Sequence, residues 1–129
     1  VKANGGLVRI LEVAGGFHSP FMQSAATELK DIFEQASVAE AQIPVYANCT
    51  GEKYQGSYTD TMLRQIVSPI LWQKSIENMI ADGVDTFIEV GPGSRLTKMI
   101  TRISKDITML NVENEETLEL AVKTAGGQK

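Results

Sequence analysis

Short apolar runs alternate along this chain with longer segments in which apolar residues recur at helical spacing. The runs have the length of strands, and glycine, proline or serine punctuates the chain between elements. Strands that alternate with helices favour parallel β-α-β units, because two parallel strands need a crossover connection. The alternation therefore predicts an α/β fold in which helices pack on a mostly parallel sheet.

The expected elements follow from the same signals. Ser19 is a suitable N-cap for the first helix, Pro20 suits its first position, and Thr59 is the expected N-cap of the second. Strands are expected at residues 7–13, 43–48, 85–90 and 108–112, a polar loop at 49–59, and helices at 19–36, 59–67, 72–83, 96–103 and 115–124.

Composition narrows the class of protein. The chain has 129 residues, of which 43% are hydrophobic and 22% charged, as in ordinary globular domains. Its net charge of −4 argues against general binding of nucleic acid. A single cysteine, Cys49, cannot form an internal disulfide, and neither a membrane-spanning run nor a signal peptide is visible. We expect a cytoplasmic protein with no nucleic acid or membrane partner.

The only histidine, His18, lies in the stretch GGFHSP, between an expected strand and an expected helix. In α/β folds, active sites collect at this kind of edge. The positive end of a helix favours a neutral imidazole, which is the form that a general base requires. The residues alone leave two interpretations open: a catalytic base, or a histidine whose ring is satisfied by backbone groups beside a helix.

A reaction partner for such a base is hard to find in the chain. No Gly-x-Ser-x-Gly motif occurs. Cys49 is more readily explained as a buried structural thiol than as a nucleophile. One histidine and one cysteine leave only an all-carboxylate metal site, and no calcium-loop pattern is present, so no metal is expected.

The stretch EVGPGSRL places Gly91 and Gly93 between a strand and a helix, where backbone N–H groups could meet an anion. The glycine pattern of a dinucleotide site and the lysine of a P-loop are both missing, which favours a close turn. The helix that follows carries four cations within an arc of about 80°. A solvated helix face and a docking surface for an acidic partner both explain this row, which consists of Arg95, Lys98, Arg102 and Lys105.

Three motifs, GGFHSPFM, VSPILWQKSIENMIADGV and FIEVGPGSRLTKMI, resemble in this order the carboxyl-terminal part of malonyl-coenzyme A:acyl carrier protein transacylases. The similarity spans residues 7–120. It implies part of an α/β-hydrolase-like core, preceded by the last strand of a ferredoxin-like subdomain. Residues 1–14 would then end that small subdomain, 15–125 would form the carboxyl-terminal part of the core, and 126–129 would be a tail.

The resemblance also implies a reaction. In this family a serine takes the acyl group from coenzyme A as an ester and passes it to the phosphopantetheine thiol of acyl carrier protein. His18 would be the general base, and the main-chain carbonyl of Gln65 would hold its other ring nitrogen. Phe17 would crowd out a branched acyl group and so favour malonyl. The coenzyme A thioester is a substrate, and no permanently bound cofactor is implied.

The serine, the arginine that pairs with the malonyl carboxylate and the oxyanion loop all belong to the family's amino-terminal portion. The chain is therefore expected to be a carboxyl-terminal fragment that is inactive alone, with that portion and acyl carrier protein as partners. The alternative is a non-catalytic α/β module that binds carrier protein through the basic helix face. A weaker third hypothesis is an anion-binding domain that uses Gly91 and Gly93.

Overall fold

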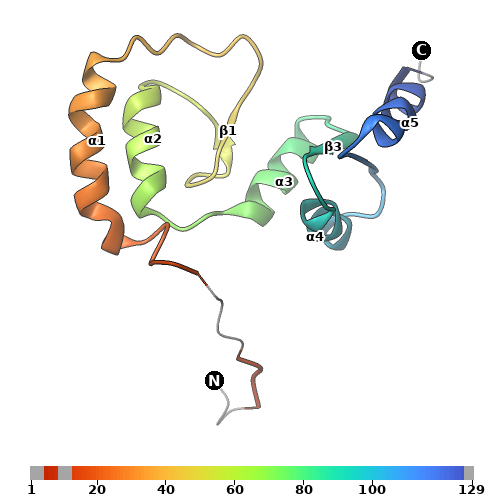
Figure 1. Cartoon of the computed structure of the whole chain (residues 1–129), viewed down its shortest axis with the longest axis horizontal. Coiled ribbons are helices and arrows are strands. Elements are labelled where there is room, and N and C mark those ends of the chain that lie inside the picture. Colours follow the sequence, from red (N-terminus) through yellow and green to blue (C-terminus); the bar gives the residue numbers. More distant parts are fainter. Residues whose placement is uncertain (1–4, 9–12, 127–129) are drawn as a thin grey trace.

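A computed structural model describes residues 5–8 and 13–126 of the chain. Two long helices lie side by side at one end, a two-stranded parallel sheet with two further helices forms the other end, and one helix connects them (Figure 1). In chain order the described elements are the 3-10 helix η2 (Pro20–Met22), α1 (Gln23–Gln35), β1 (Tyr46–Ala47), β2 (Glu52–Lys53), α2 (Tyr58–Val67), α3 (Trp72–Ala81), β3 (Thr86–Val90), α4 (Arg95–Ile103), β4 (Thr108–Val112) and α5 (Glu115–Gly126).

The parallel pair confirms the predicted α/β class. β3 and β4 pair in parallel from Thr86 opposite Thr108 to Val90 opposite Val112, and α4 is the crossover between them. Both α4 and α5 pack against β4. Since both strands consist mostly of apolar and β-branched residues bounded by loops, the sequence pattern placed them within one residue.

The antiparallel hairpin of β1 and β2 corrects two predictions. The strand expected at residues 43–48 is only Tyr46–Ala47, and its partner Glu52–Lys53 lies inside the expected loop. A tight turn reverses the chain, with the Gly51 N–H donating to Ala47 O at 2.8 Å. The second strand carries two exposed charged residues and has no apolar alternation, so the pattern that predicts strands could not reveal it.

The helix starts also differ in detail from the prediction. Ser19 is a cap, as predicted, and its Oγ accepts from Phe21 N, but the first turn is 3-10 and the α-helix begins at Gln23. The predicted cap at Thr59 is wrong. Ser57 has the extended backbone of an N-cap, and its Oγ accepts from Asp60 N at 3.2 Å, so α2 begins one residue before Thr59.

The amino-terminal prediction is mostly outside the described residues. The strand expected at residues 7–13 includes residues 9–12, which the structure does not describe, while Leu7, Val8 and Val13 belong to no strand. The expected tail at 126–129 begins with Gly126, the last residue of α5, and continues outside the described residues. The boundary of a small subdomain at residue 14 stays a prediction.

The core of the described chain is small. Its buried apolar side chains are Ala26, Ala47, Cys49, Ile76, Ile100 and Ala121. The accessible surface is 9972 Å², whereas a compact monomer of this mass exposes only about 6,700 Å². Large apolar side chains are correspondingly exposed, among them Phe21 at 89% and Val90 at 80%. Apolar exposure on this scale exceeds what monomeric globular proteins usually show, and it marks candidate interaction surfaces.

No helix within residues 5–8 and 13–126 is both long and apolar enough to span a membrane.

Candidate active site

His18 adopts an unusual backbone conformation. Its φ is 54°, and it is the one non-glycine residue with a positive φ in the described part of the chain. The left-handed conformation costs an L-residue roughly 1–2 kcal/mol. The turn around it is pinned by Ser19, whose hydroxyl donates to Gly16 O and accepts from Phe21 N. Backbone strain that the surroundings maintain clusters at functional sites, which makes His18 a candidate.

The half-buried ring of His18 is held from another element. Its Nδ1 lies 2.9 Å from the main-chain oxygen of Gln65, a residue 47 positions away in the last turn of α2. A carbonyl oxygen can only accept a hydrogen bond, so Nδ1 carries the proton of the neutral ring. The other nitrogen, Nε2, then keeps its lone pair. In its neutral form the imidazole is thus able to accept a proton at Nε2.

The carbonyl of Gln65 is available to His18 because of a proline. In a continuing helix this oxygen would accept from the N–H four residues later, but that residue is Pro69, which has no N–H. α2 ends at Val67, so the Gln65 carbonyl is one of the orphan acceptors of the helix terminus. The Ser-Pro step is therefore the sequence signal that this carbonyl lacks its helical donor, although it does not indicate which group the carbonyl meets.

Phe17 and Ser19 flank His18 in sequence, but their side chains differ in whether they are available to contact a ligand. Phe17 is 57% exposed, so its ring is open to a ligand. The hydroxyl of Ser19 is occupied by its two turn contacts, which accounts for it as a cap and not as a nucleophile. Among the described residues, no cluster of three or more histidine, cysteine or acidic side chains is arranged to hold a metal ion.

The row of cations lies away from His18, on and just after α4, at the far side of α3 from η2 (Figure 1). All four side chains, Arg95, Lys98, Arg102 and Lys105, are exposed. Within the described ranges none of them forms an ion pair with an acidic side chain. Arg102 also borders a cavity of about 540 Å³ whose walls include Trp72 and Met99. The structure therefore presents this row as an unneutralised surface.

The turn at Gly91 and Gly93 is already filled by the protein's own groups. Gly91 N–H donates to Val112 O at 2.9 Å, and Gly93 N–H donates to a carboxylate oxygen of Glu113 at 2.8 Å. These are the N–H groups on which the anion-binding hypothesis depends. Their occupation argues for a close turn between strand and helix and against that hypothesis.

Glu89 satisfies the amino terminus of α4. Its carboxylate accepts from the Thr97 hydroxyl at 2.6 Å and from the N–H groups of Thr97 and Leu96 at 2.8 and 3.0 Å. These bonds, the Thr97 hydroxyl first, hold the pKa of Glu89 below its ordinary value of 4.5. A carboxylate from β3 therefore replaces the side-chain cap that Ser94 does not supply.

Replacing Glu89 with glutamine is expected to lower the thermal stability of the chain at neutral pH. Because the folded-state pKa is depressed, the wild-type carboxylate stabilises the fold above pH 4.5, and this contribution is lost as the pH falls through the lower folded-state value. The difference in melting temperature between wild type and Glu89→Gln should therefore shrink from about pH 6 to about pH 3. Glu116→Gln controls for the loss of one charge, and a pH-independent difference would contradict the assignment.

Comparison with known proteins gives a consistent result. No protein-family model matches the chain. A malonyl CoA-acyl carrier protein transacylase from Bacillus subtilis is 35% identical over 95% of this chain and 40% of its own length. The crystal structure of such a transacylase from Clostridium perfringens is 35% identical, covers 98% of this chain and 40% of that chain, and has a TM-score of 0.92.

A third match is a malonyl-transacylase in complex with its type II PKS acyl-carrier protein, which is 27% identical and covers 88% of this chain and 38% of that chain with a TM-score of 0.84. The chain spans about 40% of the length of the curated relative from Bacillus subtilis. These comparisons confirm the resemblance drawn from the motifs: over most of its length, this chain is homologous to malonyl CoA-acyl carrier protein transacylases.

Proposed function

We propose that this chain supplies the histidine half of a malonyl-transfer site, with His18 as general base. The observation that carries the proposal is the 2.9 Å contact of His18 Nδ1 with the Gln65 carbonyl, which leaves Nε2 as the proton acceptor. In the first step Nε2 removes the proton of a serine hydroxyl while the serine oxygen attacks the thioester carbon of malonyl-coenzyme A. The carbon–sulfur bond then breaks, and the imidazolium returns the proton to the departing thiolate.

In the second half of the reaction a thiol is the nucleophile and the seryl oxygen is the leaving group. The phosphopantetheine thiol of acyl carrier protein gives its proton to Nε2 and attacks the seryl ester. The seryl oxygen leaves with the proton from His18, and the malonyl group remains on the carrier thiol. The Gln65 carbonyl lies at the carboxyl end of α2, where partial negative charge favours the cation that His18 becomes in each step.

Phe17 is the proposed selectivity residue. It precedes the base directly, and its ring is more than half exposed, so an acyl group on the serine would contact it. A bulky ring at this place leaves room for malonyl and crowds an α-methyl branch. The substrates in this proposal are a coenzyme A thioester and the phosphopantetheine of the carrier, and no permanently bound cofactor takes part.

The nucleophilic serine is proposed to come from polypeptide outside these 129 residues, from the remaining length of the relatives. The exposed sheet supports this view. Ile88 and Val90 are two residues apart in β3 and therefore lie on the same face, where they are 47% and 80% exposed. Parallel sheets, in contrast, are normally covered on both faces. An amino-terminal portion that carries the serine and packs on this face would complete both the core and the site.

Reconstitution tests this proposal. The chain is mixed with a separately expressed amino-terminal portion of a transacylase relative, and transfer of radiolabelled malonyl from coenzyme A to carrier protein is measured. Neither part alone should transfer malonyl, and the mixture should do so through a label on a serine of the amino-terminal portion. Transfer by this chain alone, or a labelled serine within it, would refute the proposed division of the site.

A second candidate function is binding of acyl carrier protein through the row of cations on α4, because all four are exposed and unpaired within the described ranges. Reversing two of them, Lys98→Glu with Arg102→Glu, is expected to weaken binding of labelled carrier protein about tenfold at low salt. The matched control reverses Lys30 and Lys123, which lie on other helices. Equal affinity of the two variants at low salt would exclude the row as a docking surface.

A further inference from the structure

Gln65 makes two hydrogen bonds with different parts of its structure. Its main-chain oxygen accepts from His18, and its side-chain Oε1 accepts from the backbone N–H of Asn48 at 2.9 Å. We propose that the Gln65 amide and the Asn48 backbone form a positioning relay that fixes the carbonyl facing His18. This inference rests on the proposed role of His18 as the base, and it assigns to the Gln65 side chain a role that the sequence motifs do not predict.

The carbonyl needs such a support because of where it lies. Gln65 is two residues from the end of α2, and the missing N–H of Pro69 removes the helical hydrogen bond that would otherwise orient its C=O. The last turn of a helix frays readily when its carbonyls have no intrahelical partner. A tether on the side chain of the same residue restricts its backbone, and therefore the direction in which its carbonyl points.

The other end of the relay is itself held. Asn48 is the first residue of the turn between β1 and β2, and its carbonyl accepts from Leu71 N, immediately before α3, at 2.7 Å. The turn closes through Ala47 O, which accepts from Thr50 N and Gly51 N at 3.2 and 2.8 Å. Asn48 thus contacts α2 through its N–H and the start of α3 through its C=O.

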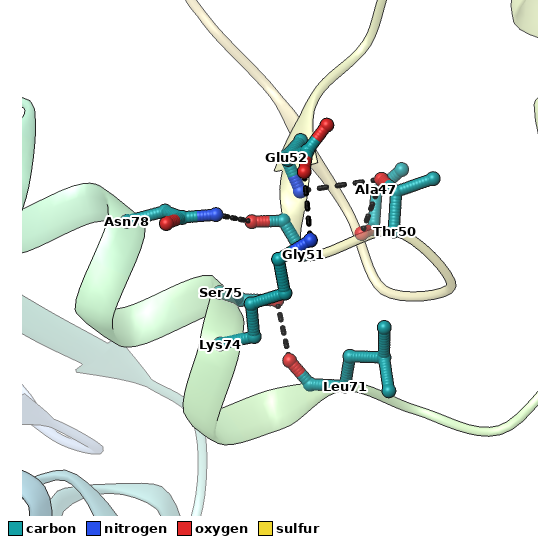
Figure 2. A network of polar contacts seen from close by, with 8 residues as sticks. All are labelled: Ala47, Thr50, Gly51, Glu52, Leu71, Lys74, Ser75 and Asn78. Carbon is teal, nitrogen blue, oxygen red and sulfur yellow. Dashed lines mark hydrogen bonds and ion pairs between the residues drawn. The ribbon is translucent and has the colours of Figure 1, made fainter.

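The turn is docked on α3 by side chains. Asn78 donates to Gly51 O and Lys74 donates to Glu52, both at 2.7 Å. Figure 2 shows that the two side chains extend from α3 to the turn. Such contacts between segments distant in sequence fix the turn more firmly than its own short ladder of two pairs could. The relay therefore runs from α3 through the turn and Gln65 to the imidazole.

The chemistry of the contact defines the variants that test it. A backbone N–H can only donate, so the atom of Gln65 that faces Asn48 is the amide oxygen. Gln65→Met keeps the length of the side chain and removes the acceptor, whereas Gln65→Glu keeps an acceptor oxygen. Asn48→Ala retains the N–H that the relay uses, and the backbone of Asn48 has no positive φ that would exclude alanine.

The experiment measures the tautomer of the His18 ring by NMR in the full 129-residue chain labelled with ¹⁵N-histidine. Long-range ¹H–¹⁵N spectra at a pH where the ring is neutral report which nitrogen carries the proton. The wild type should hold the proton mainly on Nδ1. Gln65→Met should reduce the ratio of the Nδ1–H to the Nε2–H form about two- to tenfold, as expected for loss of one neutral hydrogen bond. Gln65→Glu and Asn48→Ala should keep the wild-type ratio.

A merely structural role of Gln65 predicts a different result. It would lower the melting temperature of Gln65→Met without changing the tautomer ratio, and that outcome overturns the inference. Gln73→Met, which removes a side-chain contact with Glu77 on the exposed side of α3, controls for the substitution itself. If Gln65→Met does not fold, the tautomer ratio is measured in Gln65→Asn instead. The shorter side chain of this variant withdraws the acceptor from Asn48 and keeps the amide.

The two proposals fail in different ways. Normal malonyl transfer by a reconstituted enzyme without the imidazole of His18 would refute the role of His18 and leave the tautomer result standing. A tautomer ratio that does not respond to Gln65 would refute the relay and leave the general base in place. In the reconstituted enzyme, the relay further predicts that Gln65→Met lowers kcat and leaves KM for malonyl-coenzyme A unchanged, since Gln65 acts through His18 and not on substrate.

Discussion

Replacing His18 with alanine is expected to lower malonyl transfer by the reconstituted enzyme about 10²–10⁴-fold, which is the usual contribution of a positioned general base. The serine hydroxyl is a weak nucleophile unless a base removes its proton as it attacks. The loss should appear in both the acylation of serine by malonyl-coenzyme A and the transfer from serine to carrier protein, because His18 acts in both. Single-turnover rates of the two half-reactions, measured separately, test this.

The backbone of His18 provides the matched control. Its φ of 54° is tolerated by asparagine far better than by alanine, since asparagine is enriched in the left-handed region. His18→Asn should therefore lose transfer as fully as His18→Ala while it unfolds at a higher temperature. If transfer instead followed the stability of the two variants, the loss would be due to the turn and not to the missing base. Transfer near the wild-type rate in either variant would refute the assignment.

The sequence predicted the helices and strands that are encoded by residues close together in the chain. The helical spacing after Ser19 and the apolar runs at β3 and β4 each depend on residues within one element, and the structure follows them closely. The candidate site is a prediction that rests on position as well as on resemblance. A histidine between a strand signal and a capped helix is a candidate by its position alone, although the residues leave its role open.

What the sequence could not predict depends on contacts between distant segments. The pairing of Glu52–Lys53 with β1 requires the turn to dock on α3, and Glu52–Lys53 has no apolar face that would indicate a strand. The contact of Gln65 Oε1 with Asn48 joins two segments that are 17 residues apart, and no spacing rule encodes it. The positive φ of His18 is likewise imposed by its surroundings, since histidine does not adopt it by preference.

Composition also did not reveal how few of the apolar side chains are buried among the described residues. A hydrophobic content of 43% is ordinary for a domain that buries its own core, yet Ile88 and Val90 of this chain face outward. Composition counts apolar residues and does not say which polypeptide covers them. The structure therefore adds a fact that the sequence pattern alone leaves out, namely which apolar face of β3 the described residues leave uncovered.

The second large effect is expected at Gly51, the residue that lets the β1–β2 turn approach α3. Its φ is 70°, and a Cβ there would lie 2.9–3.0 Å from the Cβ, Cγ and Cδ atoms of Lys74. Gly51→Ala should destabilise the chain by about 1–2 kcal/mol for the left-handed backbone and by a further 1–3 kcal/mol, roughly, for the overpacking. Equilibrium unfolding in urea measures the sum.

Gly56→Ala separates the two contributions, because Gly56 has nearly the same φ, 67°, and a Cβ added to it would meet no atom within 4 Å. It should show only the backbone cost of about 1–2 kcal/mol. Because Asn48 belongs to the turn that Gly51 closes, Gly51→Ala should also shift the tautomer ratio of His18, whereas Gly56→Ala should not. Equal destabilisation by the two substitutions would show that the turn is not pressed against α3, and would remove the support on which the relay to His18 depends.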